Sequence, residues 1–355
     1  MLLDRYIGWT VGRAFLLITT GLTALFSLLS FVEQLGLIGQ GRYTLRDALL
    51  YTLLTAPTRL LPIAPVSMLL ATLLGLGGLA RHSELTAFRS FGVSQARLIG
   101  AVVRLCLPII LALFIIAQFI IPPAQQAAQR QQAAALGDAL SGLSNGGFWA
   151  QKNGVFLNVQ SFAGGADLRG VAIFTFGPDG GLQSLIEADT AAPQPDGTWA
   201  LSGITRDTIT NGQPVADKPA SLIWQPFLSS KQLQLLAIPP QTMPPLALYA
   251  YVRQLKHLHQ AALLYEQAFW SMVAVPLSLI GMALIAGPFV FGPQRAGGAG
   301  RQLVIGALLG MVFLLAQEIT GYAGLLLALN PAVSALAPSL LLLALGGWRL
   351  TRELN

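Results

Sequence analysis

The chain has 355 residues, of which 54% are hydrophobic and only 10% are charged. Soluble domains carry about 25% charged residues, so this composition excludes an ordinary soluble protein and predicts an integral membrane protein. The formal net charge is +6. The basic residues lie beside apolar runs and form no lysine-arginine block, which argues against nucleic-acid binding.

Six apolar segments reach the roughly 20 residues needed to cross a bilayer. They are Trp9 to Phe31, Leu60 to Ala80, Leu98 to Ile121, Phe269 to Phe289, Gln302 to Gly321 and Ala332 to Leu350. The first segment is as long as a true span and lacks a small-residue cleavage site after it, so we interpret it as a retained helix.

Arginines near the ends of these segments predict their orientation. Those in short connections on the N-terminal side of the membrane are Arg5, Arg81, Arg89, Arg97, Arg295, Arg301, Arg349 and Arg352. The opposite short loops carry only Arg42 and Arg46. Because cytoplasmic loops are enriched in Lys and Arg, we expect both termini in the cytoplasm and the long insert after the third segment outside.

The insert between the third and fourth apolar segments has a different character. It contains the β-type runs GVFLNVQSF, LRGVAIFTF, LQSLIEADT, TWALSG and ASLIWQP, separated by turn clusters such as GPDGG and PQPDG. Short strands at regular spacing predict a sandwich or jelly-roll of about a hundred residues. Ala247 to Gln267 then predicts an amphipathic helix that leads back to the membrane.

We therefore expect an α-helical membrane protein with six transmembrane helices and an all-β jelly-roll domain inserted between helices 3 and 4. Residues 1–137 hold the first three transmembrane helices, and residues 138–245 hold the jelly-roll. Residues 246–355 hold the connecting helix and transmembrane helices 4–6.

The polar segment LARHSELTAFRSFGVSQARL separates the second and third apolar runs. Ser83 precedes Glu84 as an N-cap would, and Gly92 supplies a C-terminal stop, which predicts a short cytoplasmic helix at residues 83–91. Its apolar side is expected to hold Leu85, Phe88 and Phe91, and its polar side Glu84 and Arg89. The residues alone leave two interpretations open: an interfacial loop, or a coupling helix that docks on a nucleotide-binding subunit.

Motifs along nearly the whole chain resemble one family. They are LDRYIG at Leu3 to Gly8, FVEQL at Phe31 to Leu35, GQGRYTLRDALLYTLLTAP ending at Pro57, LLGLGGLARHSELTAFRSFGVS ending at Ser94, GFWAQKNGVFLNV ending at Val159 and FVFGPQR at Phe289 to Arg295. Together they resemble the LptF/LptG permeases of the lipopolysaccharide-export ABC transporter. SEL-x-x-x-R-x-x-G is the most specific part, and LDRYIG and GFWA favour the LptG branch over the paralogous LptF branch.

The resemblance implies a location, an activity and a set of partners. The location is the bacterial inner membrane, with the β-domain in the periplasm. The activity is extraction of lipopolysaccharide from the outer leaflet of that membrane and its transfer to a periplasmic bridge toward the outer membrane. The partners are an LptF permease subunit, an LptB ATPase dimer, LptC, lipopolysaccharide and membrane lipids.

The resemblance also implies that the segment around Glu84 is the coupling helix that contacts the ATPase. Glu84 is then the principal contact, supported by Arg81, Ser83, Leu85, Phe88, Arg89 and Phe91. The chain has no G-x-x-x-x-G-K-[ST] phosphate loop, so we expect a non-catalytic subunit without a cofactor, and ATP and magnesium in the partner ATPase. His257 and His259 are two residues apart, which predicts different helix faces and no metal site.

Ionisable residues near the expected outer ends of the spans form a candidate lipid cavity. They are Glu33, Arg42, Arg46, Arg59 and Glu318. Charged groups at membrane depth are costly and mark functional sites, and an arginine fork matches the phosphate oxygens of lipid A. The alternative is that these side chains extend to water or pair with one another.

Two glycine pairs, Gly8 with Gly12 and Gly306 with Gly310, have the spacing that lets helices approach closely. Ordinary packing within the chain is the default interpretation, whereas the resemblance implies lateral gates formed by the first and fifth spans against the partner permease. Two other functions stay open. One is an LptF-like role, and the other is a membrane scaffold that transmits motion to its external domain without moving lipid.

Overall fold

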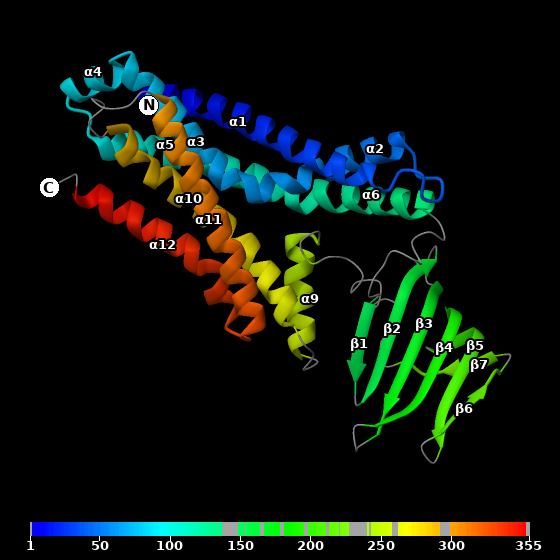
Figure 1. Cartoon of the computed structure of the whole chain (residues 1–355). Coiled ribbons are helices and arrows are strands. Elements are labelled where there is room, and N and C mark those ends of the chain that lie inside the picture. The colour runs from blue at the N-terminus through cyan, green and yellow to red at the C-terminus, as the bar shows by residue number, and fades with distance from the viewer. Residues whose placement is uncertain are drawn as a thin grey trace. The chain divides into compact units, whose positions relative to one another are not determined.

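The computed structural model describes residues 2–136, 148–152, 154–163, 167–177, 181–194, 198–210, 213–219, 221–226, 240, 243–257, 262–291 and 299–352 (Figure 1). The chain divides into two compact units. The helical unit comprises Met1–Ile38, Leu45–Gln131 and Pro240–Asn355, and the second unit, which contains a β-sheet, comprises Gly39–Thr44 and Gln132–Pro239. The predicted division at residues 137/138 and 245/246 stays a prediction.

Among the residues that the structure describes, six helical segments are long and apolar enough to cross a membrane, which confirms the six predicted spans. They are α1 (Leu2–Leu35); α2 (Leu45–Thr55), η1 (Ala56–Arg59) and α3 (Leu60–Arg81); α5 (Gln95–Ile115), η2 (Ile116–Ile120) and α6 (Ile121–Leu136); α10 (Leu263–Phe291); α11 (Ala299–Leu326); and α12 (Pro331–Arg352). Long apolar segments fold as helices because a bilayer offers no hydrogen-bond partner to an unsatisfied backbone N–H or C=O.

All six segments are longer than the predicted spans, and the second and third exceed them most. The second span continues upstream of Leu60 through the 3₁₀ turn η1 into α2, with Pro57 near the start of the turn. Proline is tolerated there because its missing N–H would have no partner in the first turn. In the third span a π-helical turn, η2, joins α5 to α6.

The predicted helix over Ala247 to Gln267 is wrong as a single element. Helix α9 (Pro245–His257) ends before α10 begins at Leu263. The backbone N–H of Leu246 in α9 donates to Gln118 Oε1 in η2 at 3.2 Å, and Lys256 pairs with Glu266 at 2.9 Å. These contacts and the packing of the Tyr249 ring on Phe269 hold α9 against the membrane helices as a separate segment. His259 lies outside the described residues.

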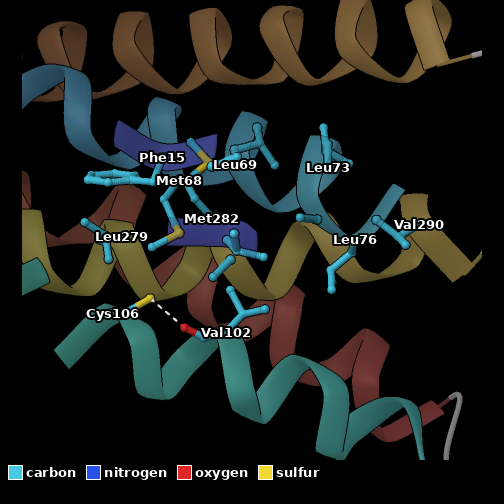
Figure 2. Close-up of a cluster of buried hydrophobic side chains, with 14 of the residues drawn as sticks. Phe15, Met68, Leu69, Leu73, Leu76, Val102, Cys106, Leu279, Met282 and Val290 are labelled. Carbon is cyan, nitrogen blue, oxygen red and sulfur yellow. Dashed lines mark hydrogen bonds between the residues drawn. The ribbon is translucent and has the colours of Figure 1, made fainter. Parts of the chain in front are cut away.

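The core of the helical unit is built around α3, which is apolar on all sides and therefore buried among its neighbours. Figure 2 shows Met68, Leu69, Leu73 and Leu76 of α3 gathered with side chains of α1, α5 and α10. α1 approaches α3 closely at Gly75, where a Cβ atom would lie 2.9 Å from Val11 Cγ2 and 3.1 Å from Val11 Cα. The glycine therefore sets the distance between these two helices.

The described strands of the second unit form one antiparallel sheet. They are β1 (Phe148–Lys152), β2 (Val155–Ala163), β3 (Asp167–Phe176), β4 (Leu182–Pro193), β5 (Trp199–Thr210), β6 (Gln213–Asp217) and β7 (Ser221–Trp224). The five predicted runs correspond to β2, β3, β4, β5 and β7, whereas β1 and β6 were not predicted. β1 to β6 pair in chain order, and β7 pairs with the first part of β5.

An antiparallel sheet among the described residues of the insert is thus confirmed, whereas the all-β jelly-roll stays a prediction. A jelly-roll combines two Greek keys and places strands distant in the chain side by side. Among the described strands, only the β5–β7 pair departs from a simple meander. The buried face of the sheet carries an apolar cluster in which Trp199 packs against Trp224 with ring centroids 5.4 Å apart.

Two glycines shift the alternation of side chains within this sheet. Gly170 has φ +63° and Gly203 has φ +68°, a conformation that residues with a Cβ adopt at a cost. Residues three apart across each glycine are consequently both buried, as Leu201 and Ile204 are in β5. The glycines keep the apolar side chains of both halves of a strand on the core face.

Candidate functional site

Helix α4 (Glu84–Ser90) forms between α3 and α5 where the sequence predicts it. The predicted N-cap geometry of Ser83 is wrong, because an N-cap is extended and Ser83 has the left-handed φ of +60°. The reason is the short reversal from α3 into α4, which leaves only His82 and Ser83 to turn the chain. The carbonyl of Ser83 still accepts the first bond of α4, from the Ala87 N–H at 3.0 Å.

The C-terminal end of α4 agrees with the sequence. Gly92 has φ +81°, and the Val93 N–H donates to the Phe88 carbonyl at 3.1 Å, as in a Schellman motif. Ser94 then caps α5, since its Oγ accepts from the Arg97 N–H at 3.3 Å. α4 is therefore a short helix with a defined start and a defined stop.

The predicted apolar side of α4 contains both buried and exposed residues. Leu85 is buried and Phe88 packs against the core of the helical unit. Phe91, the third residue of that side, is 86% exposed. α4 ends at Ser90 and the chain turns at Gly92, which leaves the Phe91 ring outside the helix and available to a partner.

Glu84 at the start of α4 is hydrogen-bonded to the first helix. Tyr6 Oη donates a hydrogen bond to Glu84 Oε2 at 2.9 Å, and Arg104 of α5 pairs with Asp4 of α1 at 3.1 Å. Sequence reasoning missed Tyr6 because it lies 78 residues from Glu84, and only the LDRYIG motif marked its neighbourhood. The start of α1 thus makes polar contacts with both α4 and α5.

The remaining residues of the predicted coupling set surround this contact. Arg81 ends α3 and is exposed. The side chain of Arg89 lies outside the described residues. The structure therefore places Arg81, Ser83, Glu84, Leu85, Phe88 and Phe91 in one short segment, with Glu84 tied to α1 and Phe91 at the exposed end.

A cavity of about 600 Å³ lies between the start of α3, the η2–α6 junction, α10 and α11. Its volume is in the range of small-molecule binding sites. Arg59 and Glu318, both predicted lipid-cavity residues, line it, and much of the remaining wall is apolar, including Leu61, Met272 and Phe313. Two of the five predicted residues are thus brought together in one site.

The other three predicted cavity residues do not line this site. Glu33 on α1 interacts electrostatically with Arg59, whose Nη1 also donates to Ser27 Oγ at 3.4 Å. Arg46 is exposed in the first turn of α2. Arg42 belongs to the other unit, where its backbone N–H donates to the Ala135 carbonyl at 2.7 Å.

Sequence reasoning missed the uncharged polar residues of the cavity. Gln125, Gln267 and Gln317 line it together with Ser271 and Ser278. Each of the three glutamines has one buried amide atom without a hydrogen-bond partner in the described part of the chain. The cavity wall therefore combines apolar surface, two charged groups and three incompletely bonded amides.

Three of the four glycines in the two predicted pairs lie close to other helices of this chain. Cβ atoms at Gly306 and Gly310 would collide with Leu73 and Val66 of α3, so these glycines allow α11 to approach α3. Gly12 faces Leu105 of α5, and a Cβ at Gly8 would meet no atom within 4 Å. This arrangement agrees with ordinary helix packing, and the lateral-gate role stays a prediction.

The comparisons with known proteins agree over nearly the whole chain. Residues 5–352 match the family model described as lipopolysaccharide export system permease LptF/LptG. The chain is 32% identical over 355 residues to the lipopolysaccharide export system permease protein LptG of Escherichia coli K12, covering 99% of this chain and 98% of that protein. It is 31% identical over 353 residues to the protein of the same name from Haemophilus influenzae, again covering 99% of this chain and 98% of that protein. The chain belongs to the LptF/LptG family of lipopolysaccharide export permeases.

Proposed function

We propose that this chain is the LptG-type membrane subunit of a lipopolysaccharide export transporter. It resides in the bacterial inner membrane, with both termini in the cytoplasm. Residues 138–245 form a jelly-roll domain in the periplasm. The LptG role is preferred over the LptF role because the two relatives reported above are both named LptG. Residues 1–137 and 246–355 then supply the membrane part.

The observation that carries the proposal is the construction of α4. A docking helix must be rigid on its inner face and offer contacts on its outer face. Leu85 and Phe88 anchor α4 to the core, the Tyr6–Glu84 hydrogen bond ties it to α1, and the exposed Phe91 ring projects beyond its end. A partner that moves α4 therefore also moves α1 and α3.

The partner proposed for α4 is the LptB ATPase dimer, which binds ATP and magnesium. The chain has no phosphate loop of its own, so the energy for transport comes from that dimer. The remaining proposed partners are an LptF permease subunit, which completes the lipid cavity, and LptC, which receives the lipid at the periplasmic bridge.

The proposed substrate is lipopolysaccharide drawn from the outer leaflet. Exposing acyl chains to water costs about 0.8 kcal/mol per CH₂ group, so a lipid with several chains needs continuous apolar shielding during extraction. The cavity lined by Leu61, Met272 and Phe313 provides an apolar wall, and Arg59 provides a fork for a phosphate group.

The test uses the complete permease complex in liposomes and measures ATP-dependent lipopolysaccharide release. Glu84→Ala is expected to abolish release while the chain still folds and inserts, because the carboxylate that faces both Tyr6 and the partner is gone. Thr86→Ala is the matched control, since Thr86 is an exposed residue on the same helix outside the predicted contact set. Unchanged release and unchanged ATPase association in Glu84→Ala would refute the coupling role of α4.

A second variant separates transport from a scaffold role. Arg59→Ala is expected to reduce stimulation of ATP hydrolysis by lipopolysaccharide, because the cavity loses its cation. A scaffold that moves no lipid has no such dependence, so full stimulation in Arg59→Ala would favour the scaffold.

A further inference from the structure

The connection between α1 and α2 is folded without slack. Each of the three residues after α1 donates its backbone N–H to the carbonyl three residues earlier, at 3.1–3.2 Å, so hydrogen-bonded turns continue directly from the helix. The Gly39 N–H then donates to the Tyr43 carbonyl at 3.3 Å, and Tyr43 is only 2% exposed. A segment with this many internal bonds opens less easily than a free loop, so it passes on a displacement of the end of α1.

Beyond these turns the α1–α2 loop (Gly39–Thr44) is docked on the end of α6. The backbone N–H of Arg42 donates to the Ala135 carbonyl at 2.7 Å. Gly41 has φ +59°, and a Cβ there would lie 2.9 Å from the Ala135 oxygen and would also collide with the Leu136 carbonyl. Both carbonyls belong to the backbone and cannot rotate away as a side chain can. Glycine therefore satisfies both the left-handed conformation and the close contact.

The docked loop belongs to the same compact unit as the sheet. Gly39–Thr44 groups with Gln132–Pro239, whereas α1 and the turns that follow it belong to the helical unit. Residues 132–136, which we call the entry segment, are the part of α6 through which the chain passes from the helical unit into the sheet-containing unit. The chain from α1 therefore reaches the sheet-containing unit at its entry segment.

The opposite end of α1 makes the contact with α4. Tyr6 donates to Glu84 at 2.9 Å, and Asp4 pairs with Arg104 at 3.1 Å. In Figure 1, α4 lies beside the N-terminal end of α1, and α2 lies beside its other end. The 34 residues of α1 span about 50 Å and include no proline that would kink the helix. One continuous helix thus connects the α4 contact to the docked loop.

The third span offers a less direct connection to the same segment. Its π-helical turn η2 interrupts the α-helical bonding between α5 and α6, and such turns are points where a helix bends. A second contact ties α2 to α6 just before the entry segment, because Gln131 Nε2 donates to Asp47 Oδ1 at 3.0 Å. The first two spans therefore hold α6 on the far side of its π-helical turn.

We propose that α1 carries the movement of α4 to the entry segment of the sheet-containing unit, and that Gly41 is the positioning residue that keeps the α1–α2 loop docked there. A partner that displaces α4 displaces α1, the hydrogen-bonded turns displace the loop, and the loop moves the entry segment. The inference rests on the proposed function, since it takes α4 as the contact of the ATPase. It goes beyond that function by assigning the route to the second unit.

The experiment measures ATP hydrolysis and lipopolysaccharide release together, for the complete permease complex in liposomes. Gly41→Ala is expected to keep ATP hydrolysis but to lower the release per ATP by about fivefold or more, the low end of typical coupling between sites. Gly39→Ala is the matched control, because Gly39 has φ +89° in the same loop and an added Cβ meets no atom within 4 Å. An unchanged ratio in Gly41→Ala, or an equal fall in both variants, overturns the proposal.

A spectroscopic measurement tests the docking without straining the loop. Spin labels are attached at Arg42→Cys and Ala134→Cys, which are exposed positions on the loop and the entry segment, whereas the native Cys106 is fully buried. The distance between the labels is expected to be short and the same with and without bound ATP, because the loop and the entry segment move together. Gly41→Ala is expected to lengthen and broaden it. A distance that changes on ATP binding in the otherwise wild-type complex overturns the proposal.

The outcome is distinguishable from that of the test of the proposed function. Release that depends on Glu84, together with an unchanged ratio in Gly41→Ala, leaves the transporter standing and removes this inference. Absence of release from the wild-type complex removes the proposed function, and this inference falls with it. If Gly41→Ala fails to fold, Gln131→Leu decides, with the exposed Gln126→Leu on the same helix as its control. A lower release per ATP in Gln131→Leu alone supports the proposal, and equal ratios in the two variants overturn it.

Discussion

The packing of α1 on α3 leads to a sharp prediction for Gly75→Ala. The added Cβ would lie 2.9 Å from Val11 Cγ2 and 3.1 Å from Val11 Cα, whereas carbon atoms in contact are normally about 3.5–4.0 Å apart. The Val11 side chain has no exposed surface, and its Cα belongs to the backbone and cannot rotate away. The two helices must therefore separate by several tenths of an ångström.

The magnitude follows from two opposing effects. Overpacking of this kind costs about 1–3 kcal/mol, and alanine in place of glycine in a helix returns up to about 1 kcal/mol. We expect a net loss of about 0–3 kcal/mol in the free energy of unfolding for Gly75→Ala relative to the wild type. Gly78→Ala, one turn further along α3, meets no atom within 4 Å and should be neutral or stabilising. Because Gly78→Ala gains the same helix propensity without the close contact, Gly75→Ala should be about 1–3 kcal/mol less stable than Gly78→Ala.

The assay is unfolding of the complete chain in detergent, followed by circular dichroism, for both variants and the wild type. The expected order of stability is Gly78→Ala at or above the wild type and Gly75→Ala below it. Equal stability of the two variants, or the reverse order, would refute the close approach of α1 and α3 at Gly75 and with it the rigid connection between α1 and α4.

Two other variants test contacts described above. Tyr6→Phe removes the bond to Glu84 but keeps the ring. We expect less ATP-dependent lipopolysaccharide release with little change in the free energy of unfolding, because the bond is exposed to solvent. Unchanged release would show that the bond does not position Glu84. Gly203 has φ +68°, and Gly203→Ala places a Cβ against the Asp189 side chain. We therefore expect the β-unit to be about 1–3 kcal/mol less stable, measured by limited proteolysis of the complete chain. The double variant with Asp189→Ala should recover only part of the loss, and full recovery would show that the backbone at Gly203 is unstrained.

The spans were predictable because a bilayer imposes one length and one composition on each of them. The stretch upstream of Leu60 was not, since Ala56 to Arg59 contains a proline and an arginine, which resemble a loop in the sequence. The structure resolves this with a 3₁₀ turn, so that α2, η1 and α3 form one continuous helical segment. A local pattern indicates a break but does not distinguish a loop from a tightened turn.

The ends of α4 were predictable only where a local sequence signal determines them. Gly92 is a local signal that needs no knowledge of other helices, and its left-handed conformation is confirmed. The left-handed Ser83 and the exposed Phe91 depend on where α3 ends and where α5 begins. The sequence places Phe91 on the apolar side of the helix, and the direction of the chain after Ser90 decides its exposure.

The cavity shows which of its lining residues the sequence could indicate. Charged residues within apolar runs were selected as candidates; Arg59 and Glu318 do line the cavity, whereas Arg42 and Arg46 do not. The glutamines were not selected, because a neutral amide gives no signal in the sequence until its hydrogen-bond partners are known. Those partners are Ala335 and Ser334, which lie 18 and 67 residues from Gln317 and Gln267. Only the packing of α12 against α10 and α11 determines which end of each amide is bonded.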